Sequence, residues 1–464
     1  MNEPRSDVFV FFGATGDLGF KEIFPALFAL FRRNQLGGPI IGVARSSLTA
    51  SQFRQRAQDS LKAYGIYQQD EFDAFARTLV YVSGDYRDMS TFERLQKALD
   101  GVSCPLFYMA VPPGMFDAVT RGIAHIRCGP HARLVIEKPF GRNLASAQAL
   151  NQVLHRCFPE KSLFRIDHFL AMETVMNLVY FRFANTFLQP LWHRRHIKSV
   201  QITMAENFGV EGRGAFYDEV GAVRDVVQNH LFQVLSVLAM ESPRDARLPD
   251  AWRDEQLNVF HSIKPLALTD VILGQFDGYQ DERGVRAGSQ AETYVAMRIQ
   301  IDNDRWREVP FYIRTGKCLP VTCLEVMVTL KAPKRSDSGM EISPAPNYFR
   351  FRLDPDMQIA VGAQIKSPGR SMQGHPVELM IRHESCAQTT PYERLLGDAI
   401  HGDDTLFTRI DNINAAWRIV EPILDHHDAP VRIYEPGSWG PENSRDVLRD
   451  GDAWHTPVMI DTPS

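Results

Sequence analysis

The sequence predicts two domains of different class: an α/β domain of the Rossmann type over residues 1–170, and an α+β domain over residues 171–464. Three observations support this. The chain has 464 residues, which is more than one ordinary hydrophobic core accommodates. Its first apolar run ends in a glycine-rich turn that an amphipathic run follows, as in a dinucleotide-binding unit. Beyond about residue 171, extended segments follow one another without regular helices between them, which is typical of an antiparallel sheet.

Composition and charge exclude several classes of protein. Hydrophobic residues make up 44% of the chain, and the net charge of -5 lacks the basic excess of a nucleic-acid-binding protein. No uncharged apolar run approaches the roughly 18 residues that span a membrane, and the polar first residues do not resemble a signal peptide. The six cysteines have no CxxC spacing, so neither a disulfide framework nor a metal site is expected. These features predict a cytoplasmic protein that binds neither nucleic acid nor membrane.

The first strand and its turn are predicted over residues 8–19. The apolar run VFVFF at 8–12 is typical of a buried parallel strand, and GATGDLG follows it at 13–19. Glycine permits a tight turn and lets backbone N–H groups approach a pyrophosphate at the start of the next helix. A glycine turn without a nucleotide is the alternative interpretation, and the following strands argue against it.

The end of the second strand indicates the cofactor. The run PIIGVA at 39–44 is followed by Arg45, Ser46 and Ser47, where an NAD-selective fold usually carries Asp or Glu. A cation with small hydroxyl donors suits a 2′-phosphate, so the sequence predicts NADP. Short-chain dehydrogenases also use spaced glycines, but they need a Tyr-x-x-x-Lys pair. None of the 13 tyrosines has a lysine four residues on, which disfavours that class.

Three further strand ends are predicted to converge on one crevice, because ligands of open α/β sheets bind at the carboxyl ends of the strands. These ends carry Pro112, where a nicotinamide could lie, Lys138, and the pair Asp167 and His168. A solvated surface lysine is the alternative for Lys138, but its place at a strand end favours a binding role. A carboxylate beside a histidine is the pairing that orients and charges a general base.

The second domain contains more strands than helices, and most neighbouring strands are expected to run antiparallel. Extended segments are predicted at 199–206, 292–301, 310–314, 324–330, 347–353, 358–365 and 376–381, and helices at 172–182, 219–240, 392–399 and 412–424.

Four residues of this domain are candidates for polar chemistry. Asp225 and His230 lie five apart on the predicted helix 219–240, about one and a half α-helical turns, so they are expected to flank a pocket without stacking. Glu206 ends an alternating strand, and Lys317 follows an aromatic one. The alternatives for these residues are a satisfied core histidine, a surface carboxylate and a turn lysine.

A longer motif connects the two domains to a known family. RIDHFLAME at 165–173 closely resembles the RIDHYLGKE signature of glucose-6-phosphate dehydrogenases. Other pieces resemble that family in the same order: the turn at 13–18, ARS at 44–46, EKPFG at 137–141, QNH at 228–230, RTGK at 314–317, PYERL at 391–395 and GSWGP at 437–441. The chain is therefore identified as a divergent member of this family along nearly its whole length.

The resemblance implies roles for the matched residues. His230 is similar to the base that takes the proton from the C1 hydroxyl of the sugar, and Asp167 to the carboxylate that orients this base. A hydride then passes from C1 to NADP and leaves a lactone. Substrate-binding roles are implied for Lys138, His168, Glu206, Asp225 and Lys317, and cofactor-binding roles for Gly13, Thr15, Gly16, Asp17, Leu18, Arg45, Ser46, Pro112 and Lys138. The family also implies helices on one face of the large sheet, and a homodimer or homotetramer joined through it.

The departures from the family pattern surround the position of the sugar phosphate. Glu22, Phe169, Met172 and Thr322 stand where the family has three lysines and a tyrosine. Each charge-assisted contact contributes roughly 1.5–3 kcal/mol, so losing several would lower the affinity for a phosphate dianion by orders of magnitude. The favoured interpretation is an NADP-dependent sugar 1-dehydrogenase with an altered phosphate pocket, acting on an unphosphorylated aldopyranose such as glucose or an amino sugar. The alternatives are an ordinary glucose-6-phosphate dehydrogenase of the pentose phosphate pathway with a rebuilt phosphate site, and a non-catalytic regulatory homologue.

Overall fold

The chain folds into two compact units. The computed structural model describes residues 4–126, 129–245, 247–332, 345–369, 373–382, 389–424 and 430–458. The first unit contains Met1–Glu173 together with Arg244–Arg253 and Ala387–Asn414, and the second contains Thr174–Pro243, Asp254–Cys386 and Ala415–Ser464. The end of the first segment lies close to the predicted boundary at residue 170, but two later segments also belong to the first unit.

The first unit is built on a six-stranded sheet in the order β3-β2-β1-β4-β5-β6, in which every neighbouring pair is parallel. The strand order reverses between β1 and β4, and ligands of such sheets bind at the carboxyl ends of the strands at this point. Every residue of β1 is buried, since helices cover both faces of such a sheet. The strands are β1 (Val8–Phe12), β2 (Ile40–Ala44), β3 (Leu79–Ser83), β4 (Pro105–Met109), β5 (Arg133–Ile136) and β6 (Leu163–Arg165).

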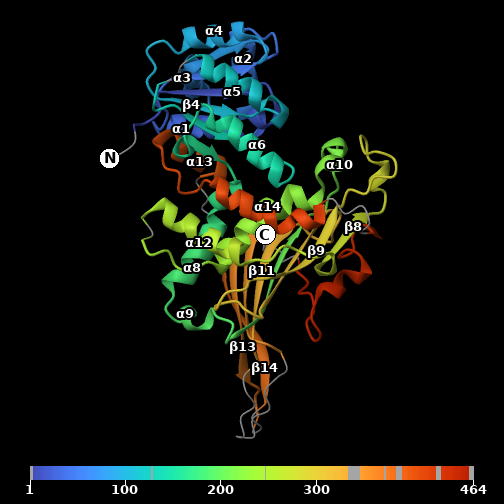
Figure 1. Cartoon of the computed structure of the whole chain (residues 1–464). Coiled ribbons are helices and arrows are strands. Elements are labelled where there is room, and N and C mark those ends of the chain that lie inside the picture. The colour runs from blue at the N-terminus through green and yellow to red at the C-terminus, as the bar shows by residue number, and fades with distance from the viewer. Residues whose placement is uncertain are drawn as a thin grey trace. The chain divides into compact units, whose positions relative to one another are not determined.

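Two groups of helices pack around this sheet, as Figure 1 shows for the blue and cyan part of the chain. Helix α1 contacts α2 and α3, whereas α5 contacts α4 and α6. Helix α2 begins at a capping box in which Thr49 and Gln52 exchange hydrogen bonds. The helices are η1 (Gly19–Ile23), α1 (Phe24–Arg32), α2 (Ala50–Ala63), α3 (Gln69–Thr78), α4 (Met89–Ala98), η2 (Pro113–Met115), α5 (Phe116–His125), α6 (Leu144–His155), η3 (Glu160–Ser162), α7 (His168–Ala171) and α13 (Pro391–His401).

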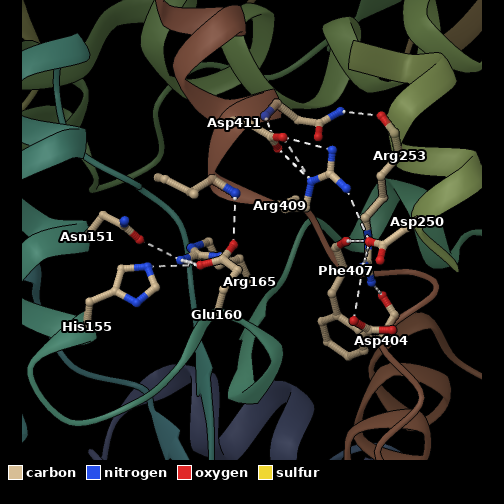
Figure 2. Close-up of polar contacts among 12 residues, drawn as sticks. Asn151, His155, Glu160, Arg165, Asp250, Arg253, Asp404, Phe407, Arg409 and Asp411 are labelled. Atoms are coloured by element: carbon tan, nitrogen blue, oxygen red, sulfur yellow. Dashed lines mark hydrogen bonds and ion pairs between the residues drawn. The ribbon is translucent and has the colours of Figure 1, made fainter. Parts of the chain in front are cut away.

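Polar contacts join two later segments to the first unit. The N–H of Ile410 donates to Oε1 of Glu160 at 3.2 Å, and the two later segments pair with each other through charged side chains. Arg253 donates a hydrogen bond to Asp404 at 2.9 Å, and Arg409 donates one to Asp250 at 3.1 Å (Figure 2). Helix α13 contacts α1 and α7, and the N–H of Ser6 donates to the carbonyl of an α13 residue. The chain therefore returns to its first unit long after leaving it.

The second unit is built on a nine-stranded sheet in the order β14-β13-β12-β11-β7-β10-β9-β8-β15. The pairs β7–β10 and β8–β15 are parallel and the others are antiparallel, which confirms the predicted, mostly antiparallel sheet. The strands are β7 (Ile197–Ala205), β8 (Val271–Phe276), β9 (Tyr294–Gln300), β10 (Pro310–Gly316), β11 (Cys323–Leu330), β12 (Tyr348–Asp354), β13 (Gln358–Lys366), β14 (Gly374–Arg382) and β15 (Arg432–Tyr434).

The predicted continuous helix over 219–240 is wrong in one respect, because it consists of three pieces: α10 (Gly214–Ala222), the π-helix η4 (Val223–Leu231) and α11 (Phe232–Ala239). Among the described residues, no helix is both long and apolar enough to cross a membrane. The remaining helices are α8 (Glu173–Ala184), α9 (Leu188–Leu191), α12 (Pro249–Ser262), η5 (Leu268–Asp270), η6 (Tyr279–Asp281), α14 (Ile410–Leu424) and η7 (Glu442–Val447).

Candidate active site

Gly13, in the turn after β1, has no room for a side chain. Gly13 has a φ of 86°, and a Cβ there would lie 2.0 Å from the carbonyl oxygen of Ala110, so only glycine fits. The N–H of Gly16 donates to the carbonyl of Gly13 at 2.8 Å, which closes the turn. A bare backbone that leads into a helix is the arrangement that accepts a pyrophosphate.

The end of β2 lies beside this turn. The hydroxyls of Thr15 and Ser46 share a hydrogen bond of 3.1 Å, and the adjacent Arg45 is exposed to solvent. Asp17 and Leu18 complete the turn, and Leu18 directly precedes η1. The structure therefore places Thr15 beside Ser46, next to the cation Arg45 that the sequence analysis assigned to a 2′-phosphate.

Tyr86 holds this turn, and the sequence analysis missed it. Its hydroxyl accepts from the N–H of Gly13 at 2.8 Å and donates to the carbonyl of Val43 at 2.9 Å. Burial raises the pKa of Tyr86 to about 12, so the hydroxyl keeps its proton. Because its partners lie far away in the sequence, no local pattern could have indicated this role.

Pro112 and Lys138 follow β4 and β5 at the carboxyl edge of the same parallel sheet. Pro112 is exposed and precedes η2, and Lys138 is half-buried. Since β1 and β4 pair in parallel, these two residues lie at the same edge as the glycine turn.

Asp167 lies where β6 turns into α7. Its side chain is buried, and its Oδ1 accepts from the N–H of Phe169 at 3.1 Å, which caps the short helix. Just before it, Arg165 donates two hydrogen bonds to Glu160, at 2.7 and 2.9 Å, and one to Asn151 at 2.6 Å (Figure 2). The backbone that carries Asp167 is therefore anchored on both sides.

A cluster of tyrosines and carboxylates lies next to His168. The ring of Tyr392 stacks on that of His168 with 6.2 Å between centroids. Tyr392 and Tyr108 both donate a hydrogen bond to the carboxylate of Glu137. Burial raises the pKa of Glu137 to about 7, although these hydrogen bonds oppose the shift. Tyr392 belongs to the PYERL segment, to which the sequence analysis gave no role.

Glu22 adds a second acid to this cluster. Burial raises the pKa of Glu22, although the charge of Lys21 opposes the shift. Burial and then the charges of Glu137 and Glu22 raise the pKa of Tyr392 far above its usual range. Phe169 is 6% exposed and offers only a ring. Glu22 and Phe169, which the sequence analysis singled out, thus place an acid and an apolar ring near His168.

Glu206 and Lys317 form an ion pair in the second unit. They follow β7 and β10, which are parallel neighbours, so the two strand ends lie at one edge of the sheet. The Nζ of Lys317 lies 2.6 Å from Oε2 of Glu206, and both side chains are largely buried. The ammonium group also lies over the rings of Phe208 and Tyr217, 4.9 and 5.6 Å from their centroids.

Asp225 and His230 lie on the π-helix η4, where hydrogen bonds join residues five apart, such as the N–H of Phe232 and the carbonyl of Val227. Residues five apart therefore lie on the same side of this helix, which corrects the expectation that Asp225 and His230 do not stack. His230 is 3% exposed. Its backbone N–H donates to the side-chain oxygen of Asn229 at 2.6 Å.

The charges of Asp225 and of Glu206 both act on Tyr217. Burial, followed by the charges of Asp225, Glu206 and Glu292, raises its pKa well above its usual range. Lys317, which pairs with Glu206, lies over the ring of Tyr217, and the charge of Asp225 also acts on the Tyr217 hydroxyl. The sequence analysis missed Tyr217, because an aromatic residue on a helix has the pattern of an ordinary core residue.

The two members of the predicted dyad belong to different units, Asp167 to the first and His230 to the second. Their pairing stays a prediction, as do the roles of the other site residues. Lys138 and His168 belong to the first unit, and Glu206, Asp225 and Lys317 to the second.

Sequence models of one family match both parts of the chain. "Glucose-6-phosphate dehydrogenase, NAD binding domain" matches residues 10–177, and "Glucose-6-phosphate dehydrogenase, C-terminal domain" matches residues 179–455. The chain is 40% identical to glucose-6-phosphate 1-dehydrogenase 1 of Mycobacterium tuberculosis (strain CDC 1551 / Oshkosh), with 98% of this chain and 97% of the relative covered. It is 36% identical to glucose-6-phosphate 1-dehydrogenase of Aggregatibacter actinomycetemcomitans, with 97% of each covered.

Solved structures agree with these matches. The crystal structure of glucose-6-phosphate 1-dehydrogenase from Mycobacterium avium superposes with a TM-score of 0.90 at 41% identity, covering 98% of this chain and 100% of that one. A glucose-6-phosphate dehydrogenase in complex with its substrate glucose-6-phosphate superposes equally well, with a TM-score of 0.90 at 33% identity and the same coverage. The first unit is a nicotinamide dinucleotide-binding domain, as predicted, and the chain belongs to the glucose-6-phosphate dehydrogenase family.

Proposed function

We propose that this protein oxidises C1 of an aldopyranose to the 1,5-lactone with NADP. The observation that carries the proposal is the family match over nearly the whole chain. The matched residues Asp167, His230 and Lys317 are buried. Buried polar groups are costly unless they are paired or functional. These three residues lie at strand ends and on a π-helix, which are common places for functional residues, and this supports catalysis.

In the proposed reaction, His230 takes the proton from the C1 hydroxyl, while Asp167 orients the imidazole and stabilises its charged form. NADP, when bound, accepts the hydride that leaves C1. C1 thereby loses two electrons and the bond from C1 to oxygen becomes a carbonyl, which gives the lactone. The sugar is held by Lys138, His168, Glu206, Asp225 and Lys317.

The first unit fits NADP. The carbonyl of Ala110 leaves no room for a side chain at Gly13, so the turn after β1 has the glycine-dependent form that leads a strand into a pyrophosphate-binding helix. The exposed guanidinium of Arg45 lies next to Ser46, whose hydroxyl contacts Thr15. These groups can bind the 2′-phosphate through charge-assisted hydrogen bonds.

Glucose 6-phosphate is the first candidate substrate, which would make the protein an ordinary glucose-6-phosphate dehydrogenase. Two relatives whose names or titles include this sugar phosphate, the Mycobacterium tuberculosis protein and the solved substrate complex, are 40% and 33% identical to this chain. Each match covers 98% of this chain. In that case His168 and the exposed Lys21 are the groups of the first unit from which a rebuilt phosphate site would begin.

An unphosphorylated aldopyranose, such as glucose or an amino sugar, is the second candidate. Glu22 favours it, because its charge acts on Tyr392, whose ring stacks on that of His168. A carboxylate repels a phosphate dianion, with little screening by salt in a partly buried site, whereas it attracts an amine and accepts a hydrogen bond from a hydroxyl.

A comparison of glucose 6-phosphate, glucose and glucosamine, each with NADP, decides between the candidates. A preference for glucose 6-phosphate of about a hundredfold in kcat/KM, a difference of roughly 2.7 kcal/mol, would establish the ordinary activity. If an unphosphorylated sugar is preferred, the combined Glu22→Lys, Phe169→Tyr, Met172→Lys and Thr322→Lys variant should move the preference toward glucose 6-phosphate. Turnover of none of these sugars would contradict the proposal and favour a non-catalytic homologue.

We also propose a homodimer or homotetramer that forms through the second sheet and acts in the cytoplasm on a small-molecule sugar. The edge strand β14 exposes Leu379 and Ile381, whose exposed fractions are 63% and 61%. An apolar edge strand readily pairs with another chain. Sedimentation equilibrium tests this proposal, and a monomer at micromolar concentration would contradict it.

A further inference from the structure

We propose that Glu292 is a positioning residue whose carboxylate fixes the start of the π-helix that carries Asp225 and His230. The proposal rests on the proposed function, because it concerns the alignment of the proposed base. The contacts of Glu292 with Gly221, Ala222 and Val223 lie within the second unit.

The helix breaks at Gly221, where φ is 62° and ψ is 176°, and restarts at Ala222. The first N–H groups of a helix have no acceptor within it and need one from elsewhere. Glu292 supplies two such acceptors. Its carbonyl accepts from the N–H of Ala222 at 2.9 Å, and its Oε1 accepts from the N–H of Val223 at 3.0 Å.

The carboxylate of Glu292 also occupies the space beside Gly221. A Cβ at Gly221 would lie 2.4 Å from Oε1 and 2.5 Å from Oε2 of Glu292. Only glycine at position 221 therefore leaves space for the carboxylate of Glu292. Glu292 is 9% exposed, and burial raises its pKa. It also borders a cavity of about 450 Å³, together with Gly221, Val223 and Arg224. The start of the π-helix therefore has room to move when the carboxylate contact is lost.

The residue after Glu292 connects this contact to the Glu206–Lys317 ion pair. The carbonyl of Thr293 accepts from the N–H of Lys317 at 3.0 Å. Strand β9, which begins one residue later, pairs with β10, which ends just before Lys317. The segment formed by Glu292 and Thr293 thus holds both the start of the π-helix and the strand end that carries Lys317. Loss of the carboxylate contact would displace Asp225 and His230 relative to Lys317.

Three variants of Glu292 test this role. Glu292→Gln keeps an acceptor oxygen on a side chain of the same length. Glu292→Asp keeps the charge on a side chain one methylene shorter, and Glu292→Ala removes the acceptor. We expect kcat to fall about tenfold to a hundredfold for Glu292→Asp and Glu292→Ala, since a displacement of about 1 Å can have that effect. Glu292→Gln should rescue kcat, and the Michaelis constant for NADP should stay unchanged in all three. Gln290→Ala, an exposed residue of the same loop, is the matched control.

Hydrogen exchange of the amides at Ala222 and Val223 provides a readout that needs no substrate. Exchange should be faster in Glu292→Asp and Glu292→Ala than in Glu292→Gln, Gln290→Ala and the unmodified protein. Unchanged exchange, or unchanged kcat in Glu292→Asp, would overturn the positioning role. If the unmodified protein oxidised no sugar, the proposed function would fail, and the exchange rates would still decide whether Glu292 holds the helix. If Glu292→Ala does not fold, the comparison of Asp with Gln remains decisive.

Discussion

The ammonium group of Lys317 lies 2.6 Å from a carboxylate oxygen of Glu206, and the two residues follow neighbouring parallel strands. Only 11% and 17% of their side chains are exposed, so both charges are largely removed from water. Such a pair contributes little net stability, because desolvation offsets much of the attraction. A largely buried pair of this kind therefore fits the proposed role of both residues in sugar binding better than a role in stabilising the fold.

Replacing Lys317 with methionine should raise the Michaelis constant for the sugar at least about tenfold, since a charge-assisted hydrogen bond contributes roughly 1.5–3 kcal/mol. It should also lower the melting temperature, because Glu206 loses its partner in a largely buried place. The combined Lys317→Met and Glu206→Gln variant should recover part of the stability without recovering the sugar affinity. An unchanged Michaelis constant in Lys317→Met would exclude this residue from the sugar site.

The Arg45→Ala variant should bind NADP at least about tenfold more weakly, because one charge-assisted contact to the 2′-phosphate is lost. Binding of NAD should change little, since NAD lacks that phosphate. Dissociation constants from fluorescence titration with both cofactors provide the measurement. Arg54, which is exposed on α2, gives a matched alanine control. Equal losses of affinity for NADP and NAD would contradict the assignment of Arg45 to the 2′-phosphate.

Proton transfer by His230 can be separated from cofactor binding. His230→Asn should abolish turnover and leave the affinity for NADP intact, because the base acts only on the sugar hydroxyl. Asp167→Asn should lower kcat strongly, with a smaller effect on the Michaelis constant. Near-normal turnover of His230→Asn in a steady-state assay would show that the proposed dyad is wrong.

The stability of the protein should depend on pH through Glu137. Its pKa is raised from 4.5 to about 7 in the folded protein. Its contribution to stability is therefore fully present below pH 4.5 and is lost as the pH rises through 7. Relative to the unmodified protein, Glu137→Gln should gain stability between pH 5 and 8, by up to roughly 3 kcal/mol. Denaturant unfolding of both proteins at the two pH values tests this, and a constant difference would contradict it.

Much of the fold could be predicted because its signals are local. Uninterrupted apolar runs such as 8–12 mark buried parallel strands, and the glycine at position 13 is required by a positive φ and a close backbone contact. Most strands of the second sheet were also predicted, whereas the short strands β8 and β15 and helix α12 were missed. The motif around Asp167 and His168 indicated chemistry from residue types alone.

Only the tertiary structure decided how distant segments meet. The segment Ala387–Asn414 belongs to the first unit because the N–H groups of Thr408 and Ile410 find acceptors at Arg165 and Glu160. The segment Arg244–Arg253 pairs in turn with Asp404 and Arg409. Asp225 and His230 lie on one side of their helix because the helix restarts after Gly221 as a π-helix, with Glu292 as its acceptor. The sequence determined which segments are strands, turns and helices, since each residue's neighbours specify local backbone and burial. It could not determine which remote carboxylate, hydroxyl or carbonyl satisfies a given donor, because those partners are selected by packing.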